Sequence, residues 1–155
     1  MTRGQDFGAA VVTEARTWIG TPFHWQQSTK GRGCDCKGLI AGVAREIGRD
    51  EAASRFAAMG DYRPGKVPLA ALAQGLATLF DRVDTACPGD ILLLLAGGAP
   101  QHLAIVSEAH AGVPHRMIHC YGKGPSRVIE VPMGHVWRGA IVSIWRWRQE
   151  ATDVG

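Results

Sequence analysis

The first half of the chain carries apolar residues at helical spacing. The pattern predicts a first helix that Asp6 caps and Gly20 ends. Its apolar stripe consists of Val11, Ala15, Trp18 and Ile19. A second helix is predicted to begin near Cys36 and to stop at Gly48, with one face formed by Cys36, Leu39, Ile40, Val43, Ala44 and Ile47. A third helix is expected over about Leu69–Phe80, with a stripe of Leu69, Leu72, Ala73, Leu76 and Leu79.

The second half of the chain has the shorter pattern of strands. After a turn at Pro88–Asp90, apolar segments cover residues 91–95, 102–109, 116–122, 127–132 and 140–148. Gly- and Pro-containing loops separate them, which is typical of an antiparallel sheet. Helices followed by strands indicate an α+β fold. Without an internal repeat or a long linker, residues 1–155 are expected to form one domain.

Composition and charge narrow the classes of partner. Of the 155 residues, 46% are hydrophobic and 20% are charged, as in a globular protein with a real core. The formal net charge is +3, and the basic residues are scattered without a Lys/Arg run. We therefore expect no nucleic-acid partner. The longest apolar run, residues 91–99, is far too short for a membrane span, so we expect no membrane partner either.

The N-terminus and the cysteines bear on the cellular compartment. Residues 1–20 contain no uninterrupted apolar segment of the length of a signal-peptide core and no small-residue cleavage site, so we expect synthesis in the cytoplasm without a signal peptide. The four cysteines, Cys34, Cys36, Cys87 and Cys120, are then expected to be reduced thiols.

Cys36 occupies a chemically unusual place, the start of the second predicted helix. Asp35 stands at the N-cap position, and the first backbone N–H groups of a helix stabilise an anion. A cysteine there is expected to have a lowered pKa, which favours the nucleophilic thiolate. The same N–H groups can hold a developing oxyanion. The alternative is that Cys36 is a small core residue on the apolar face of its helix.

Two of the six histidines are candidates for a general base. His110, His115 and His135 lie in turn-rich stretches and are expected at the surface. His102 instead opens an apolar strand, and His119 interrupts another. If these strands pair, the two-residue alternation places both imidazoles on the same side of the sheet.

Three side chains then fit the pattern of an activated nucleophile. Cys36 would attack, His102 would act as the base, and His119 would orient His102. Two other interpretations remain open. Each histidine can be a partly buried structural residue, or Cys34, Cys36, His102 and His119 can together bind zinc.

Several segments together resemble the NlpC/P60 cysteine peptidases, and more narrowly the branch encoded in phage and gene-transfer-agent tail clusters. The resemblance covers residues 7–148 and is carried by "WIGTPFHWQQ", "GCDCKGLIAGVAREIG", "PGDILLL", "HLAIV", "MIHCYG" and "VIEVP". It implies a papain-like α+β core in which N-terminal helices pack on a C-terminal antiparallel sheet. It also implies cleavage of peptidoglycan stem peptides, commonly between D-glutamate and diaminopimelate, without a metal or other cofactor.

Residue by residue, the resemblance agrees with the roles given above. Cys36 matches the nucleophile, His102 the base and His119 the third polar residue. Asp35 and Gly38 match the box around the nucleophile, and Gly89 and Asp90 match the turn that enters the sheet.

Two positions depart from the family pattern. Lys37 stands where a serine is usual, and Phe23 replaces a tyrosine whose hydroxyl lies near the nucleophile in many members. His24 or Trp25 can line the site instead. The loss of that hydroxyl keeps open a weakly active or inactive structural module. A cell-wall amidase of related chemistry is a further alternative.

The resemblance also suggests where the protein acts. A tail component would be delivered to the bacterial cell wall by a phage-like particle and would bind tail-hub or baseplate proteins. We expect an exposed apolar surface for such a partner, with Trp137, Trp145 and Trp147 as candidates. The alternative for Trp145 and Trp147 is that they close the core.

Overall fold

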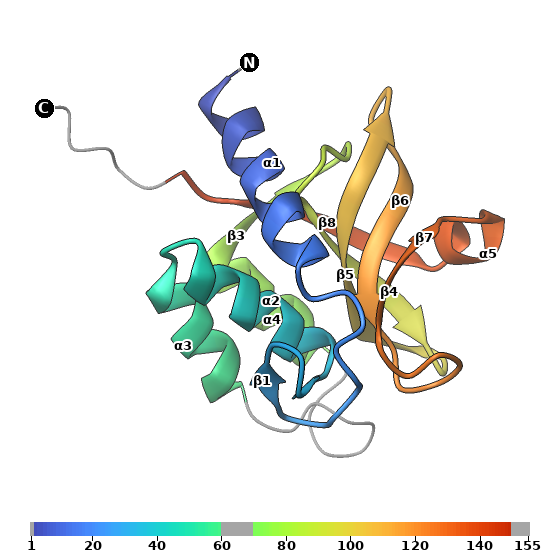
Figure 1. Ribbon diagram of the computed structural model, residues 1–155. Helices are drawn as coiled ribbons and strands as arrows, with labels where there is room; N and C mark the ends of the chain where they lie inside the picture. The colour runs from blue at the N-terminus through green and yellow to red at the C-terminus, as the bar shows by residue number, and fades with distance from the viewer. Residues whose placement is uncertain (1, 60–69, 150–155) are drawn as a thin grey trace, which may run out of the picture.

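The computed structural model describes residues 2–59 and 70–149, and it has the α+β fold expected from the sequence (Figure 1). Most helices come first: α1 (Arg3–Arg16), α2 (Cys36–Glu46), α3 (Asp50–Ala58) and α4 (Ala71–Leu79). Two short strands, β1 (Ser28–Thr29) and β2 (Gly33–Cys34), precede α2. The main strands follow: β3 (Phe80–Val83), β4 (Ile91–Ala96), β5 (Ala99–His110), β6 (Val113–Cys120), β7 (Val128–Pro132) and β8 (Ile141–Trp147). A short helix, α5 (His135–Gly139), connects β7 to β8.

The main sheet is buried on both faces. Within the described residues it has six strands in the order β3-β8-β4-β5-β6-β7, all antiparallel. Helices α1 and α2 cover one face, and α5 lies on the opposite side (Figure 1). This explains the uninterrupted apolar run of β4, because Ile91 and Leu93 face one hydrophobic cluster while Leu92 and Leu94 face the other.

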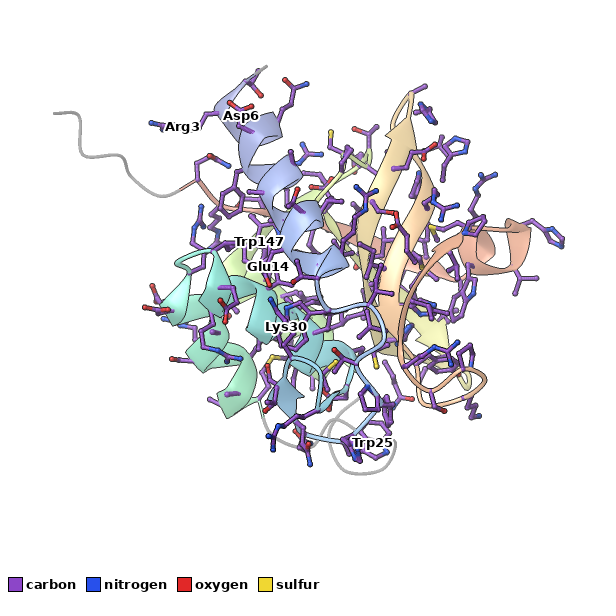
Figure 2. The ribbon with its side chains drawn as sticks, in the orientation of Figure 1. Arg3, Asp6, Glu14, Trp25, Lys30 and Trp147 are labelled. Carbon is purple, nitrogen blue, oxygen red and sulfur yellow. The ribbon has the colours of Figure 1, made fainter. Side chains whose placement is uncertain are left out.

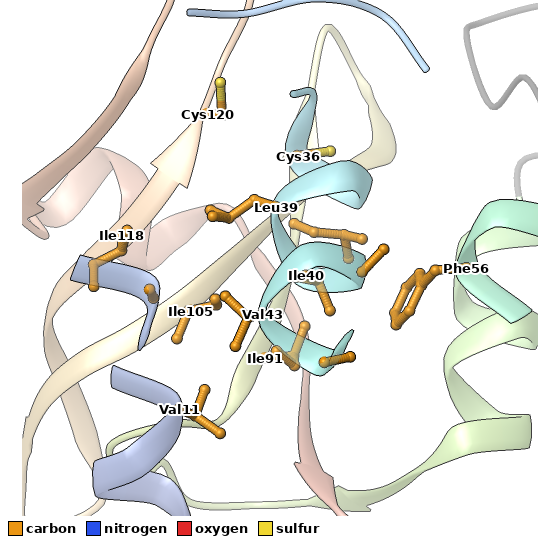
Figure 3. Close-up of a cluster of buried hydrophobic side chains, with 14 of the residues drawn as sticks. Val11, Cys36, Leu39, Ile40, Val43, Phe56, Ile91, Ile105, Ile118 and Cys120 are labelled. Atoms are coloured by element: carbon orange, nitrogen blue, oxygen red, sulfur yellow. The ribbon is translucent and has the colours of Figure 1, made fainter. Parts of the chain in front are cut away.

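The larger hydrophobic cluster fixes α2 against the sheet. Leu39 and Val43 of α2 lie toward Ile105 of β5 and Ile118 of β6, and Cys36 lies at the upper end of this helix in the view of Figure 3. All four of these aliphatic side chains are buried. Burial of each contributes about 1.5–3 kcal/mol, so the position of the helix start is set by its apolar face.

The first helix begins earlier than the sequence pattern suggests. Thr2 is its N-cap: the hydroxyl of Thr2 accepts from the backbone N–H of Gln5 at 3.1 Å, and the Gln5 side chain accepts from the N–H of Thr2 at 2.8 Å. Asp6, predicted as the cap, instead lies in the first turn. The helix ends at Arg16, so Ile19 leaves the helical phase and is 48% exposed.

The second predicted helix is confirmed, and the third is shorter than expected. Helix α2 begins at Cys36 and is followed by Gly48 at φ 85°. Of the third helix, Leu69 lies outside the described residues, and Phe80 starts β3 opposite Trp147. The sequence pattern did not predict α3, the strand β3, or the short pair β1 and β2.

The tryptophans of β8 close the core and do not form a partner surface, so that prediction is wrong for Trp145 and Trp147. They are 6% and 4% exposed. The ring of Trp147 packs edge-on against Phe80 with centroids 4.9 Å apart, and its indole N–H donates to the carbonyl of Gly89 at 3.0 Å. Alternate residues of β8 face the helices, which is why both rings are buried.

The turn before β4 is held by charge and by close backbone contact. The Asp90 carboxylate accepts from Arg146 Nε at 3.0 Å and from Arg146 Nη2 at 2.8 Å. Gly89 has φ 93°, and a Cβ there would lie 2.6 Å from the Cα of Gly8. The turn that enters the sheet therefore also fixes α1.

No helix within the described residues has the length and apolar character needed to span a membrane.

Candidate active site

Cys36 is the first residue of α2, and Asp35 caps the helix as predicted. One carboxylate oxygen of Asp35 accepts from the N–H of Gly38 at 2.7 Å, and the other accepts from the N–H of Gln26 at 2.7 Å. Asp35 is fully buried, so these bonds replace its lost hydration. Its negative charge is thereby directed to backbone donors.

Gly38 allows the preceding loop to approach the first turn of α2. A Cβ at Gly38 would lie 1.9 Å from the carbonyl oxygen of Gln27, a distance that backbone atoms cannot tolerate. We expect Gly38→Ala to displace the cap and to lower the free energy of unfolding by about 2–4 kcal/mol. Urea unfolding of the purified variant measures this. Gly139→Ala adds the same methyl group where no atom beyond its chain neighbours and its own helix backbone lies within 4 Å, and it should change stability little. Equal stability of both variants would contradict the proposed crowding.

The two candidate histidines lie side by side in the sheet. Strand β5 pairs with β6, with Ile105 opposite Ile118, and the Nε2 of His102 lies 2.7 Å from the Nδ1 of His119. Each side chain is 3% exposed. The expectation that both imidazoles point to one side of the sheet is confirmed.

This hydrogen bond determines which nitrogen of His102 is left for chemistry. Because Nε2 is bound to His119, Nδ1 is the ring nitrogen of His102 that can accept a proton from a thiol. For Nδ1 to be a free acceptor, Nε2 must carry the hydrogen and donate it to His119 Nδ1. His119 then carries its own hydrogen on Nε2. The pair can thus hold His102 in the tautomer of a base.

Cys36 and His102 line one cavity, called here the Cys36 cavity. Its volume is about 330 Å³, and its walls include Phe23, Gln101 and Tyr121. The sulfur of Cys36 lies 4.0 Å from the carbonyl oxygen of Gln101, the residue before His102. The start of α2 therefore meets the beginning of β5. Cys36 is 3% exposed, and what surface it has faces this cavity.

Burial keeps both imidazoles neutral in the folded protein. Burial lowers the pKa of His102 far below its usual value, and the neighbouring His119 ring lowers it further. Burial also lowers the pKa of His119, to about 4. A base must be neutral to accept a proton, so the lowered pKa values extend the basic form of the pair into acidic solution.

The same burial makes stability depend on pH. Imidazoles of the unfolded chain, with a pKa of about 6.5, bind protons below that pH while the folded pair does not, so the free energy of unfolding falls as the pH falls. We expect a loss of about 2 kcal/mol per histidine between pH 7 and pH 5. Urea unfolding at the two pH values measures it. The His119→Gln variant has one imidazole fewer, so its free energy of unfolding should fall markedly less between pH 7 and pH 5 than that of the wild type. An equal fall in both proteins would contradict neutral burial of His119.

Two aromatic residues complete the surroundings of the histidine pair. The ring of Trp137, from α5, has its centroid 5.7 Å from that of His102 and 5.4 Å from that of His119. The ring of Tyr121 lies 4.8 Å from that of His102. Trp137 is partly exposed and packs against the histidines, and its role as a partner surface stays a prediction. Its contact with the histidines could not be predicted because α5 reaches the pair only through the tertiary fold.

The departure at Phe23 lies at the site itself. Phe23 lines the Cys36 cavity, so this position contributes a ring without a hydroxyl. Trp25 also lines the cavity; it is 44% exposed and points outward in Figure 2. His24, the other candidate, is exposed and is not part of the wall. Tyr121, which alternation along the predicted strand 116–122 places on the face of His119, brings a phenol to the same cavity.

The remaining cysteines do not surround a metal site. Among residues 2–59 and 70–149, no group of three or more His, Cys, Asp or Glu side chains is arranged to hold a metal ion. Cys34 is buried against Cys120, whose thiol donates to the carbonyl of Cys34 at 3.3 Å. All four cysteines are free thiols. The zinc interpretation of Cys34, Cys36, His102 and His119 is therefore not supported by the geometry.

Comparison with solved structures identifies the fold. The NlpC/p60 domain of the peptidoglycan hydrolase SagA is similar to this chain with a TM-score of 0.55 and 26% identity, over 89% of this chain and 97% of that chain. A lipoprotein-like NLP/P60 family protein of Staphylococcus aureus has a TM-score of 0.60 and 18% identity, over 93% of this chain and 42% of that chain.

A third similar structure is that of Ly7917 with the hydrolysis product of MDP. Its TM-score is 0.54 at 16% identity, over 90% of this chain and 62% of that chain. The sequence matches no protein-family model and no curated protein. The fold is therefore that of the NlpC/P60 domain of the peptidoglycan hydrolase SagA.

Proposed function

We propose that this protein is a cysteine peptidase that hydrolyses peptidoglycan stem peptides. One observation carries the proposal: Cys36 at the start of α2 lines the same cavity as His102, whose Nε2 is 2.7 Å from His119 Nδ1. A nucleophile, a base and an orienting group are the parts that covalent acyl transfer requires. The similarity to the SagA domain supports peptidoglycan as the substrate.

The proposed reaction has two steps. The sulfur of Cys36 bonds to the carbonyl carbon of the scissile amide while its proton passes to His102 Nδ1, and the backbone N–H groups at the start of α2 stabilise the oxyanion. The C–N bond then breaks, and the imidazolium gives the proton to the leaving amine. In the second step water, deprotonated by His102, attacks the thioester and releases the peptide acid and the thiol.

The scissile bond is proposed to join D-glutamate and diaminopimelate, as the family resemblance implies. The test is incubation of purified peptidoglycan with the protein, followed by mass spectrometry of the released fragments. New N-terminal diaminopimelate groups are expected. Free stem peptides that begin with the first amino acid would instead show that the protein is an amidase. If no fragments are released, the protein is not a peptidase and the structural module is favoured.

The structural module has one observation in its favour, which is Phe23 in the wall of the Cys36 cavity. If the hydroxyl missing at this position were required for turnover, the protein would bind stem peptides without cleaving them. Tyr121 brings another phenol to the same wall, which favours the enzyme. The fragment experiment separates the two functions.

We further propose that the protein acts at the bacterial cell wall as a component of a phage-like tail, bound to hub or baseplate proteins. The family branch that the sequence resembles supports this, and exposed apolar side chains such as Leu95 and Val136 offer contact surface. Proteomics of particles purified from the producing strain tests it. Particles that lack the chain would contradict the tail assignment without affecting the peptidase.

A further inference from the structure

Two cavities adjoin at the loop that follows β6. One is the Cys36 cavity, with His102 in its wall. The other, called here the His119 cavity, has a volume of about 220 Å³ and is lined by His119 and Trp137. Tyr121 and Lys123 line both cavities. The hydrogen-bonded histidines thus contribute one imidazole to each cavity, and Lys123 stands where the two meet.

Each of the two cavities has at least one lysine or arginine at its wall. Lys123 lines both, and Arg127 lines the His119 cavity, whereas no described aspartate or glutamate lines either one. Within the described part of the chain, neither cationic head group makes a hydrogen bond or an ion pair. Much of the remaining wall is aromatic or aliphatic, including Phe23 and Ile129. Both residues are exposed at the rim of the cavities, so they can attract an anion from solution, with a strength that falls as ionic strength rises.

The backbone that carries Lys123 is held in place. The carbonyl of Ser126 accepts from the N–H of Phe23 at 2.8 Å, and the hydroxyl of Ser126 donates to the carbonyl of Gly122 at 3.0 Å. Pro22 and Arg127 form an isolated antiparallel bridge. These bonds join the loop to the segment that contributes Phe23 to the Cys36 cavity. The backbone on both sides of Lys123 is therefore tied to this segment, and Lys123 itself lies exposed on the rim.

We propose that Lys123, assisted by Arg127, forms a subsite that binds a free carboxylate of the substrate beside the scissile bond. The inference rests on the proposed function, because it deepens the same site. A D-glutamate linked through its γ-carboxyl keeps its α-carboxylate, which lies next to the bond proposed for cleavage. Amidation of that carboxylate removes its charge and one acceptor oxygen. The subsite therefore distinguishes the acid from the amide.

The experiment uses two synthetic stem peptides, L-Ala-γ-D-Glu-diaminopimelate and the same peptide with the glutamate α-carboxylate amidated. We expect the full chain to cleave the acid with about tenfold higher kcat/KM, mainly through a lower KM. Lys123→Gln should remove most of this preference, and Lys123→Arg should keep it. Higher ionic strength should reduce it because the charges are exposed at the rim.

A charge-matched control and a binding measurement keep the two proposals separable. Arg82→Gln also removes one positive charge, on β3 at the opposite edge of the sheet, and it should retain the preference. Calorimetry with Cys36→Ala compares affinity for the two peptides without turnover. If the chain cleaves neither peptide but binds the acid more tightly through Lys123, the subsite stands and the peptidase fails. Equal or undetectable binding of both peptides, or a preference that survives Lys123→Gln, would overturn the subsite.

Discussion

Replacing Cys36 by alanine is expected to lower the rate of stem-peptide hydrolysis by about 10⁴-fold or more, to the limit of detection. The alanine methyl group cannot form the thioester, and no other described cysteine lines the Cys36 cavity except the fully buried Cys120. The measurement is the release of soluble fragments from purified peptidoglycan. Wild-type activity in this variant would remove Cys36 from the mechanism.

The loss of activity in Cys36→Ala must be distinguished from a loss caused by unfolding of the variant. Removal of one sulfur at a residue that borders a cavity should cost about 1 kcal/mol, which shifts Tm by about 2–4 °C for a domain of this size. Thermal unfolding followed by circular dichroism measures this shift. Cys87→Ala is the matched control, because Cys87 is an exposed free thiol outside the Cys36 cavity and its loss should leave activity unchanged.

Replacing His102 by alanine is expected to have the second largest effect, a fall in kcat of about 10³-fold. The variant keeps the thiol but loses the group that accepts its proton and later protonates the leaving amine. Steady-state kinetics on the synthetic stem peptide measure kcat and KM. A raised KM with unchanged kcat would instead show that His102 binds substrate and does not transfer protons.

The wild-type pH profile gives an independent test of His102 as the base. Because burial lowers its pKa, the neutral form persists as the pH falls, and the acidic limb of kcat/KM should lie well below pH 6.5. An acidic limb near 6.5 would indicate a hydrated imidazole and would contradict the observed burial.

His119 is expected to act as a positioning residue through its bond to His102. His119→Ala should lower kcat by about 10²-fold because His102 loses the acceptor that fixes its tautomer. His119→Gln offers a carbonyl acceptor and should recover part of the rate. Equal losses in the two variants, with an unchanged pH profile, would indicate a packing role instead.

Local sequence signals predicted α2 and its cap well because both depend on neighbouring residues. Asp35 and Gly38 are three positions apart, and this spacing suffices to place a carboxylate on an unpaired N–H group. The first helix shows the limit of the same reasoning, since Thr2 with Gln5 forms a complete capping box and takes the cap role from Asp6. Where two residues can both cap a helix, the one that makes more hydrogen bonds to the unpaired N–H groups sets the start of the helix.

Long-range contacts were harder to predict. Trp137 reaches the histidine pair from α5, and no periodicity in the sequence indicates that it does. Alternation along the predicted strand 116–122 did place Tyr121 on the face of His119, but not its ring 4.8 Å from that of His102. For Trp145 and Trp147 the sequence left open a contact surface or closure of the core, and closure of the core is confirmed. They are buried because β8 lies inside the sheet, between β3 and β4.

Spacing along the chain was enough to predict the α+β class, a cysteine at a helix start, and two histidines that alternation could place on one face of paired strands. Those features follow from spacing along the chain, which local backbone geometry converts directly into structure. The tertiary structure alone decided that β5 and β6 bring the histidine nitrogens within 2.7 Å, and that Cys36 and His102 share a cavity with Lys123 at its rim. Such distances depend on how apolar faces of distant segments pack, and no single segment encodes them.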